Sequence, residues 1–91
     1  MYKRQTTIVN PTGLHARPAS DFVSTAKKFS SKISITDLNA SNQPVNAKSI
    51  LILLSLGLGQ GTAIAISADG TDETEAVDSL VALIETGFGE L

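Results

Sequence analysis

Apolar residues recur at two different spacings along this chain, and the spacing changes from segment to segment. Between residues 16 and 29 they fall three and four positions apart, which predicts a helix with one buried face. Lys32–Leu38 alternates apolar and polar residues instead, with Ile33 and Ile35 on one side, as in a half-exposed strand. The positions expected on the buried helix face are Ala16, Ala19, Phe22, Val23, Ala26 and Phe29.

The flanking segments repeat both patterns. A β-branched run over Gln5–Val9 predicts a strand that stops at the turn 10–13, and Thr62–Ser67 predicts another that stops at the turn 68–70. Asp72 and Glu75 have the spacing of a capping box at the start of a second long helix. Gly87 is its expected C-cap, and its buried face would carry Ala76, Val77, Leu80, Val81, Leu83 and Ile84.

The middle of the chain is less regular. The polar turn Asn39–Pro44 is expected to join the strand 32–38 to a short strand around Val45 in an antiparallel hairpin. Lys48–Leu56 fits either a short buried helix or a strand, and Ser49 favours the helix because it is a good N-cap residue. The order of elements predicts a single α+β domain over residues 1–91. It would be an open-faced β-sandwich, with a four-stranded antiparallel sheet and three helices on one face.

Composition narrows the classes of function. The chain has 91 residues, of which 42% are hydrophobic, so it can bury a core; it has no cysteine for a disulfide, a thiolate metal site or a nucleophile. A net charge of −2 and an aromatic content of 4% argue against nucleic acid as a partner. No signal segment follows Met1–Gln5, and the apolar run Ile50–Leu58 is shorter than the roughly 20 residues that span a bilayer. We therefore expect a cytoplasmic protein without membrane insertion.

Two further patterns have ordinary structural explanations. The acidic residues of segment 69–75 suit a turn and a helix start, so we expect no metal site and no cofactor. The glycines of Gly57–Gly61 superficially suggest a nucleotide loop. They follow a short apolar helix and precede a strand, the reverse of the dinucleotide-binding order, and turn glycines are the better interpretation.

The only histidine of the sequence, His15, is placed for anion chemistry. It lies next to Arg17 and Pro18 where the first helix is expected to begin, and a helix N-terminus offers free N–H groups and a favourable dipole for negative charge. A neutral imidazole there can accept a phosphoryl group. The N–H groups of Ala16 and Arg17 and the Arg17 guanidinium would hold the resulting anion, and Pro18 would stiffen the turn.

The residues around His15 resemble a known family. Segment 13–19, Gly-Leu-His-Ala-Arg-Pro-Ala, resembles the active-site signature of the HPr family, the histidine phosphocarriers of the bacterial phosphoenolpyruvate-dependent sugar phosphotransferase system. Segments 46–50, 55–58 and 66–70 are similar to further family motifs in the same order, and the resemblance covers essentially the whole chain. The long hairpin 39–44 and the Gly-Phe-Gly-Glu segment resemble the HPr-like domain of fructose-type multiphosphoryl transfer proteins. A stand-alone carrier and one domain of a fusion therefore both remain open.

The resemblance implies a role for each site residue. His15 would accept phosphate on Nδ1 from enzyme I and donate it to the IIA components of sugar permeases, and Arg17 would stabilise the phosphate. The chain would then be a phosphocarrier component rather than a free-standing catalyst. Ser49 would be a regulatory phosphorylation site for an HPr kinase/phosphorylase.

The resemblance also implies a docking surface for these partners on a monomer. It would consist of Leu14, Ala16, Ile50, Leu51 and Leu54, while Leu53 and Leu56 face the core and Ile52 replaces the glycine or polar residue common in the family. Lys27 and Lys48 would pair with acidic rims of partners.

Two other functions are weighed against the carrier. One is a regulatory docking module of the same fold in sugar or nitrogen signalling, controlled at Ser49; the presence of His15 counts against this as the sole role. The other is an unrelated α+β binding domain that contacts RNA, which the acidic balance and the few aromatic residues disfavour.

Overall fold

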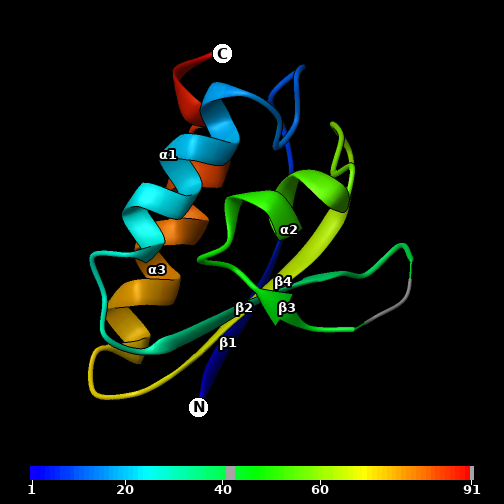
Figure 1. Ribbon diagram of the computed structural model, residues 1–91. Helices are drawn as coiled ribbons and strands as arrows, with labels where there is room; N and C mark the ends of the chain where they lie inside the picture. Colours follow the sequence, from blue (N-terminus) through cyan, green and yellow to red (C-terminus); the bar gives the residue numbers. More distant parts are fainter. Residues whose placement is uncertain (41–42, 91) are drawn as a thin grey trace.

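A computed structural model describes residues 1–40 and 43–90, which form a twisted sheet with its helices on one face (Figure 1). In this described part the strands are β1 (Tyr2–Thr7), β2 (Lys32–Asp37), β3 (Val45–Asn46) and β4 (Ala63–Asp69). The helices are α1 (Arg17–Ala26), α2 (Ile50–Ser55) and α3 (Glu73–Glu85), followed by the short 3₁₀ helix η1 (Gly87–Gly89). The predicted α+β class and the predicted order of strands and α-helices are confirmed.

The sheet has the order β1-β4-β2-β3, and every neighbouring pair is antiparallel. β4 is central: it pairs along its length with β1 on one side and with β2 on the other. β3 is short and pairs with β2 through Ser34 opposite Asn46 and Ile35 opposite Val45, the predicted hairpin. Ile33 and Ile35 are buried while their neighbours are more exposed, as strand alternation requires.

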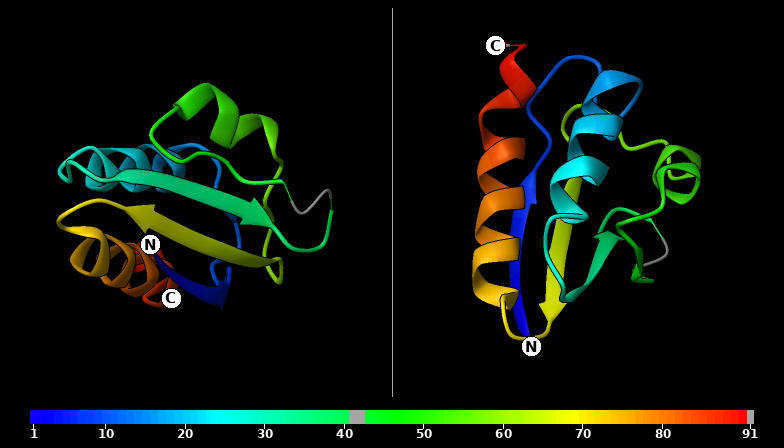
Figure 2. Two further views of the ribbon diagram at one scale, coloured as in Figure 1. Left: turned by 90° about the horizontal axis from the view of Figure 1, so that it is seen from below. Right: turned by 60° about the vertical axis from the view of Figure 1, so that its left-hand side comes forward.

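Helices α1 and α3 lie side by side across one face of the sheet (Figure 2). Their apolar stripes meet the inward side chains of the strands in one core. From the helices this core receives the buried residues Ala19, Phe22, Val23, Ala26, Ala76, Val77, Leu80, Val81 and Ile84. The expectation that Ala16 belongs to this stripe is wrong: Ala16 is exposed and precedes the first turn of α1.

The segment that fitted either a helix or a strand is the helix α2. Ser49 is its N-cap, and the Ser49 Oγ accepts a hydrogen bond from the Ile52 N–H at 3.3 Å. Within this helix Leu53 alone is fully buried, so α2 presents most of its apolar residues to the surface.

Pairing and tertiary contacts shift several expected boundaries. The first strand is Tyr2–Thr7 rather than Gln5–Val9, because its register is set by β4, and Ala68 and Asp69 belong to β4 rather than to the turn. The expected capping box is also wrong. The Asp72 side chain makes no cap hydrogen bond and instead accepts from Ser30 and Ser31.

Part of the expected turn 39–44, Ser41 and Asn42, lies outside the described residues. The described helices include none with the length and apolar character needed to cross a membrane.

Candidate functional site

The loop between β1 and α1 carries the histidine, and hydrogen bonds fix it to the loop between α2 and β4. The Leu14 N–H donates to the Leu58 carbonyl at 2.8 Å, and the Gly61 N–H donates to the Ile8 carbonyl at 2.7 Å. Leu14 is buried, with 1% of its surface exposed. The backbone on both sides of Gly13 is therefore held in one conformation.

Position 13 of the histidine loop requires glycine. Its φ is +69°, in the left-handed region, and a Cβ there would collide with the Leu58 carbonyl oxygen. Glycine therefore lets the two loops approach closely enough for the Leu14–Leu58 hydrogen bond.

His15 is exposed where this loop meets the start of α1. Its side chain lines a hollow of about 220 Å³ together with Leu54 of α2 and Leu58, Gly57 and Gly59 of the following loop. The imidazole is thus open to a partner from solvent and has apolar surface of α2 beside it. Leu54 and His15, both predicted as site residues, line the same hollow.

The first turn of α1 is uncapped. Ala16 occupies the N-cap position with φ 52° and ψ −123°, makes no side-chain cap bond, and is followed by Arg17 and Pro18. Across residues 1–40 and 43–90, the backbone N–H groups of Ala16 and Arg17 donate to no protein acceptor. Free N–H groups at the positive end of a helix dipole are suited to an anion.

Arg17 does not share the hollow of His15. It lines a separate hollow of about 410 Å³ with Pro18, Asp21 and the segment Phe88–Glu90. Arg17 is exposed, and it forms no ion pair within the described part of the chain. Its guanidinium is therefore not committed to a carboxylate of the protein, while its expected contact with phosphate stays a prediction.

A polar cluster that the sequence analysis did not identify lies behind the histidine loop. Asn10, Thr12 and Glu90 are joined by hydrogen bonds, and Asn10 also donates to the Gly13 carbonyl at 2.9 Å. Hydrogen bonds from Asn10 and then Thr12 lower the pKa of Glu90 below its usual value. In the sequence Asn10 appeared only as a turn residue, and no local signal connects it with position 90.

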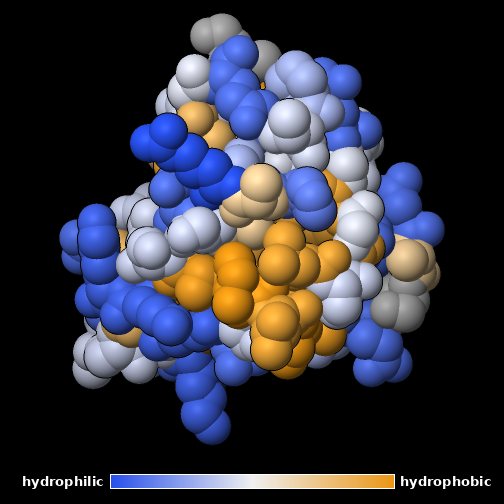
Figure 3. Space-filling model, turned by 45° about the horizontal axis from the view of Figure 1, so that its top comes forward, coloured by the Kyte–Doolittle hydropathy of each residue, from blue (hydrophilic) through white to orange (hydrophobic). Residues whose placement is uncertain are grey.

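An apolar patch formed by Ile50, Leu51, Ile52 and Leu54 covers the outer side of α2 (Figure 3). Leu51 is 78% exposed and the other three are 36–38% exposed. The patch includes the three α2 residues expected to dock partners and adds Ile52, which the sequence analysis had noted only as a departure from the family. Leu14, also expected there, is 1% exposed and lies outside the patch, although it lines the hollow of His15.

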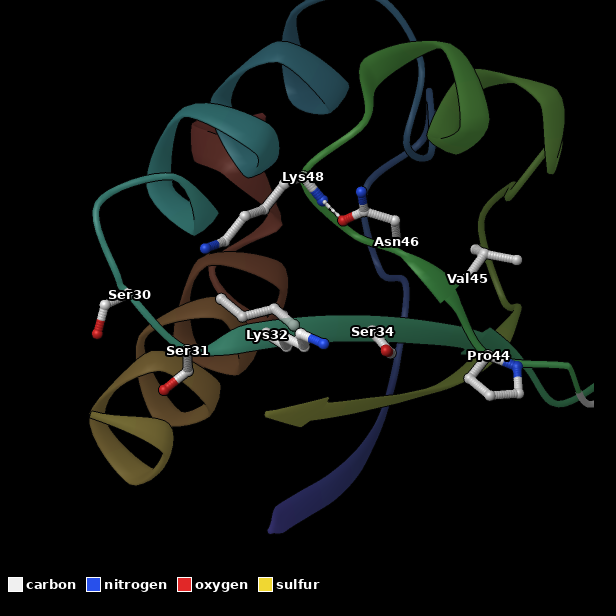
Figure 4. Close-up of a pocket in the computed structure, with 9 residues that line it drawn as sticks. Ser30, Ser31, Lys32, Ser34, Pro44, Val45, Asn46 and Lys48 are labelled. Carbon is white, nitrogen blue, oxygen red and sulfur yellow. Dashed lines mark hydrogen bonds between the residues drawn. The ribbon is translucent and has the colours of Figure 1, made fainter. Parts of the chain in front are cut away.

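A larger hollow of about 430 Å³ lies along β2 and β3, away from His15 (Figure 4). Lys32 and Lys48 both line it, and the Lys48 N–H donates to the Asn46 Oδ1 at 2.9 Å. The Lys48 ammonium donates to the Phe29 carbonyl at 2.7 Å, in the turn that follows α1. Lys27 is exposed. The pairing of Lys27 and Lys48 with partners stays a prediction.

Comparison with known proteins agrees with this geometry. Residues 2–86 match the family model described as the PTS HPr component phosphorylation site. The phosphocarrier protein HPr of Haemophilus influenzae is 49% identical over 86 residues, covering 94% of this chain and 98% of that protein. A multiphosphoryl transfer protein of the same organism is 42% identical over 83 residues, covering 91% of this chain and 17% of that protein.

Among solved structures, HPr-C-His from Thermoanaerobacter tengcongensis superposes with a TM-score of 0.93 at 52% identity, covering 100% of this chain and 99% of that one. An exposed histidine thus precedes an uncapped helix on an open-faced α+β sandwich. The chain belongs to the HPr family, the phosphocarriers of the phosphotransferase system.

Proposed function

We propose that this protein accepts a phosphoryl group on His15 from enzyme I and donates it to the IIA components of sugar permeases, working in the cytoplasm as a monomer. The observation that carries the proposal is the exposed imidazole of His15 directly before the uncapped N-terminus of α1. A neutral imidazole is a good nucleophile, and the N–H groups of Ala16 and Arg17 are free to bind the oxygens of the product.

Arg17 completes the charge balance. A phosphoryl group in transfer needs positioning and neutralisation more than covalent help, and a guanidinium supplies both through paired N–H donors. The Arg17 side chain is exposed, forms no ion pair within the described residues and lies two residues from His15 in the sequence.

The apolar patch on α2 supports docking. Large exposed apolar side chains gathered beside a reactive group are typical of a protein–protein interface. Leu54 belongs both to the patch and to the hollow of His15, which connects binding of a partner with access to the imidazole.

The test is phosphorylation with phosphoenolpyruvate, magnesium and enzyme I, followed by intact-mass measurement before and after acid treatment. One added phosphate, lost in acid and absent from His15→Ala, is the expected result. An unchanged mass after complete reaction conditions, with a known HPr labelled in parallel, contradicts the proposal.

A second role is favoured by the position of Ser49. Its Oγ caps α2 and lies at the edge of the apolar patch, so a phosphate there would place about two negative charges beside surface that must be desolvated on docking. An ATP-dependent kinase preparation should add an acid-stable phosphate that is absent from Ser49→Ala. Persistence of the label in Ser49→Ala would exclude this site.

A further inference from the structure

The segment after α3 folds back onto the histidine loop. Gly87, Phe88 and Gly89 have φ values of 68°, 54° and 78°, so three left-handed residues follow one another. Phe88 packs against the core, and the Glu90 N–H donates to the Gly87 carbonyl at 2.9 Å. Figure 1 shows the end of this segment beside the start of α1. The turn thus brings the Glu90 carboxylate to the loop that carries His15.

Glu90 is bound there by several hydrogen bonds. Thr12 Oγ1 lies 2.9 and 2.8 Å from the two carboxylate oxygens, and Asn10 Nδ2 donates to Oε1 at 3.1 Å. The same Asn10 amide donates to the Gly13 carbonyl at 2.9 Å. Asn10 therefore links the Glu90 carboxylate to a carbonyl that lies two residues before His15.

The contacts of the buried Asn10 side-chain amide permit only one of its two orientations. Asn10 is 0% exposed, and its Oδ1 has no partner among the described residues, so the bonds it makes all run through Nδ2. Turning the amide over would bring its oxygen against the Gly13 carbonyl and the Glu90 carboxylate, which are both acceptors. The carboxylate therefore selects the amide orientation that holds Gly13. Glutamate is ionised at neutral pH at its ordinary pKa, and the hydrogen bonds from Asn10 and Thr12 lower the pKa of Glu90 further.

We propose that Glu90 is a positioning residue for phosphoryl transfer: acting through Asn10, it holds the Gly13 carbonyl and so fixes the place of His15 in front of α1. This inference rests on the proposed carrier function. Misplacing a nucleophile by about 1 Å costs on the order of 100-fold in rate, so a loosened loop affects the chemical step. Glu90 does not belong to the apolar patch, so docking should be preserved.

The experiment measures kcat and KM of enzyme I with this protein as the acceptor. Glu90→Ala is expected to lower kcat by about tenfold or more while KM stays within about twofold. Glu90→Gln keeps an oxygen that can accept from Asn10, and we expect it to restore kcat to within about threefold of the original. The matched control is Glu85→Ala, on α3. It removes a carboxylate that accepts a hydrogen bond from Thr6 Oγ1 at 3.1 Å, and it should leave kcat unchanged.

Two further measurements separate positioning from a general loss of structure. The amide NMR signals of Gly13, Leu14 and His15 should shift in Glu90→Ala and not in Glu85→Ala, and this readout needs no phosphorylation. Asn10→Ala should lower kcat to a similar extent, with no further loss in the double variant, because both residues act through one link. If Glu90→Ala does not fold, Glu90→Asp provides the test instead. Aspartate keeps the negative charge but has a shorter side chain, so Glu90→Asp should lower kcat as expected for Glu90→Ala.

An unchanged kcat in a folded Glu90→Ala overturns the inference, as does a raised KM with unchanged kcat, which would assign Glu90 to docking. Failure of the original protein to be phosphorylated overturns the proposed function instead. In that event, unshifted amide NMR signals of Gly13, Leu14 and His15 in Glu90→Ala would show that Glu90 does not hold the histidine loop.

Discussion

Ala16 holds a backbone conformation that alanine seldom adopts. Its φ of 52° and ψ of −123° form the mirror image of the extended region, which glycine reaches readily and other residues do not. The residue lies between His15 and the first turn of α1. Its conformation turns the chain so that His15 is exposed while Pro18 and Ala19 enter the core.

Replacing Ala16 with glycine should therefore stabilise the fold. Strain at such a position costs about 1–3 kcal/mol, and the greater freedom of glycine in the unfolded chain offsets about 0.5–1 kcal/mol of the gain. We expect Ala16→Gly to raise the free energy of unfolding by about 1 kcal/mol in urea denaturation.

The control is Ala82→Gly, at an exposed alanine in the regular helix α3. This substitution should lower the free energy of unfolding by about 1 kcal/mol. An equal loss in both variants would show that Ala16 carries no strain.

Single residues also show where sequence reasoning reaches its limit. His15 and Arg17 stand out because their neighbours form a local motif, and the uncapped helix start follows from that motif. Leu14 is harder to place, because an apolar residue beside a site can face either way. Its orientation is decided by the Leu58 carbonyl, far along the chain. Asn10 and Glu90 were not predicted as a pair because their contact also joins positions far apart in the sequence.

At the scale of elements, α2 is a short helix whose main contribution is to the surface. Ser49 caps it and Leu53 anchors it, while its four other large apolar residues are partly or largely exposed. A helix of six residues has little stability of its own, so capping and packing hold it. The exposed side chains are then free to serve recognition.

A charge placed on this helix should weaken docking without unfolding the protein. We expect Leu51→Asp, at a position 78% exposed, to raise the KM for enzyme I by about tenfold or more, because a carboxylate would be desolvated at the interface. The matched control is Ala82→Asp, which adds the same charge to an exposed position of α3.

Leu51→Asp should keep the unfolding free energy within about 0.5 kcal/mol of the original, whereas Ala82→Asp should lower it by about 1 kcal/mol because aspartate is a poorer helix former than alanine. Equal KM values for Leu51→Asp and Ala82→Asp would show that the apolar patch on α2 is not part of the docking surface.

The elements themselves were largely predictable, because apolar spacing reports helices and strands directly. The expectation that Gly87 is the C-cap of α3 is wrong by one residue: the cap is Thr86, and Gly87 follows it in the left-handed conformation. Asp72 was not predictable, since its spacing to Glu75 suits a local cap while its carboxylate is used by Ser30 and Ser31. Tertiary contacts here override a local motif.

For the whole molecule, carboxylates join distant segments at both ends of α3. Asp72 ties the start of this helix to the beginning of β2, Glu73 accepts from the Gly70 N–H, and Glu90 binds the histidine loop. The hydrogen bond from the Ser31 hydroxyl, followed by that from the Ser30 N–H, lowers the pKa of Asp72 to about 2. The pKa of Glu73 is lowered chiefly by its bond from Gly70.

These shifts predict loss of stability in acid. A carboxylate with a lowered folded-state pKa contributes its stability above its unfolded value, 3.8 for Asp72, and loses it as the pH falls toward about 2. The unfolding free energy should therefore decrease between pH 4 and pH 2, and Asp72→Asn should flatten that decrease.

Ser31→Ala removes the largest cause, so the folded-state pKa of Asp72 should move toward its unfolded value, and the decrease should become smaller and end at a higher pH. Unfolding curves measured across this range provide the check, and an identical slope in Asp72→Asn would assign the acid sensitivity to other groups.

The central place of β4 in the sheet also bears on how the protein is made. β1 and β2 emerge from the ribosome first, yet each pairs with β4, and the two do not pair with each other. The histidine loop likewise takes backbone hydrogen bonds from residues 58–62 and side-chain hydrogen bonds from Glu90. A nascent chain that already carries His15 and Arg17 thus lacks these supports until the later segments have been synthesised. Under the proposed function, phosphoryl uptake is therefore expected only from chains whose sheet has closed.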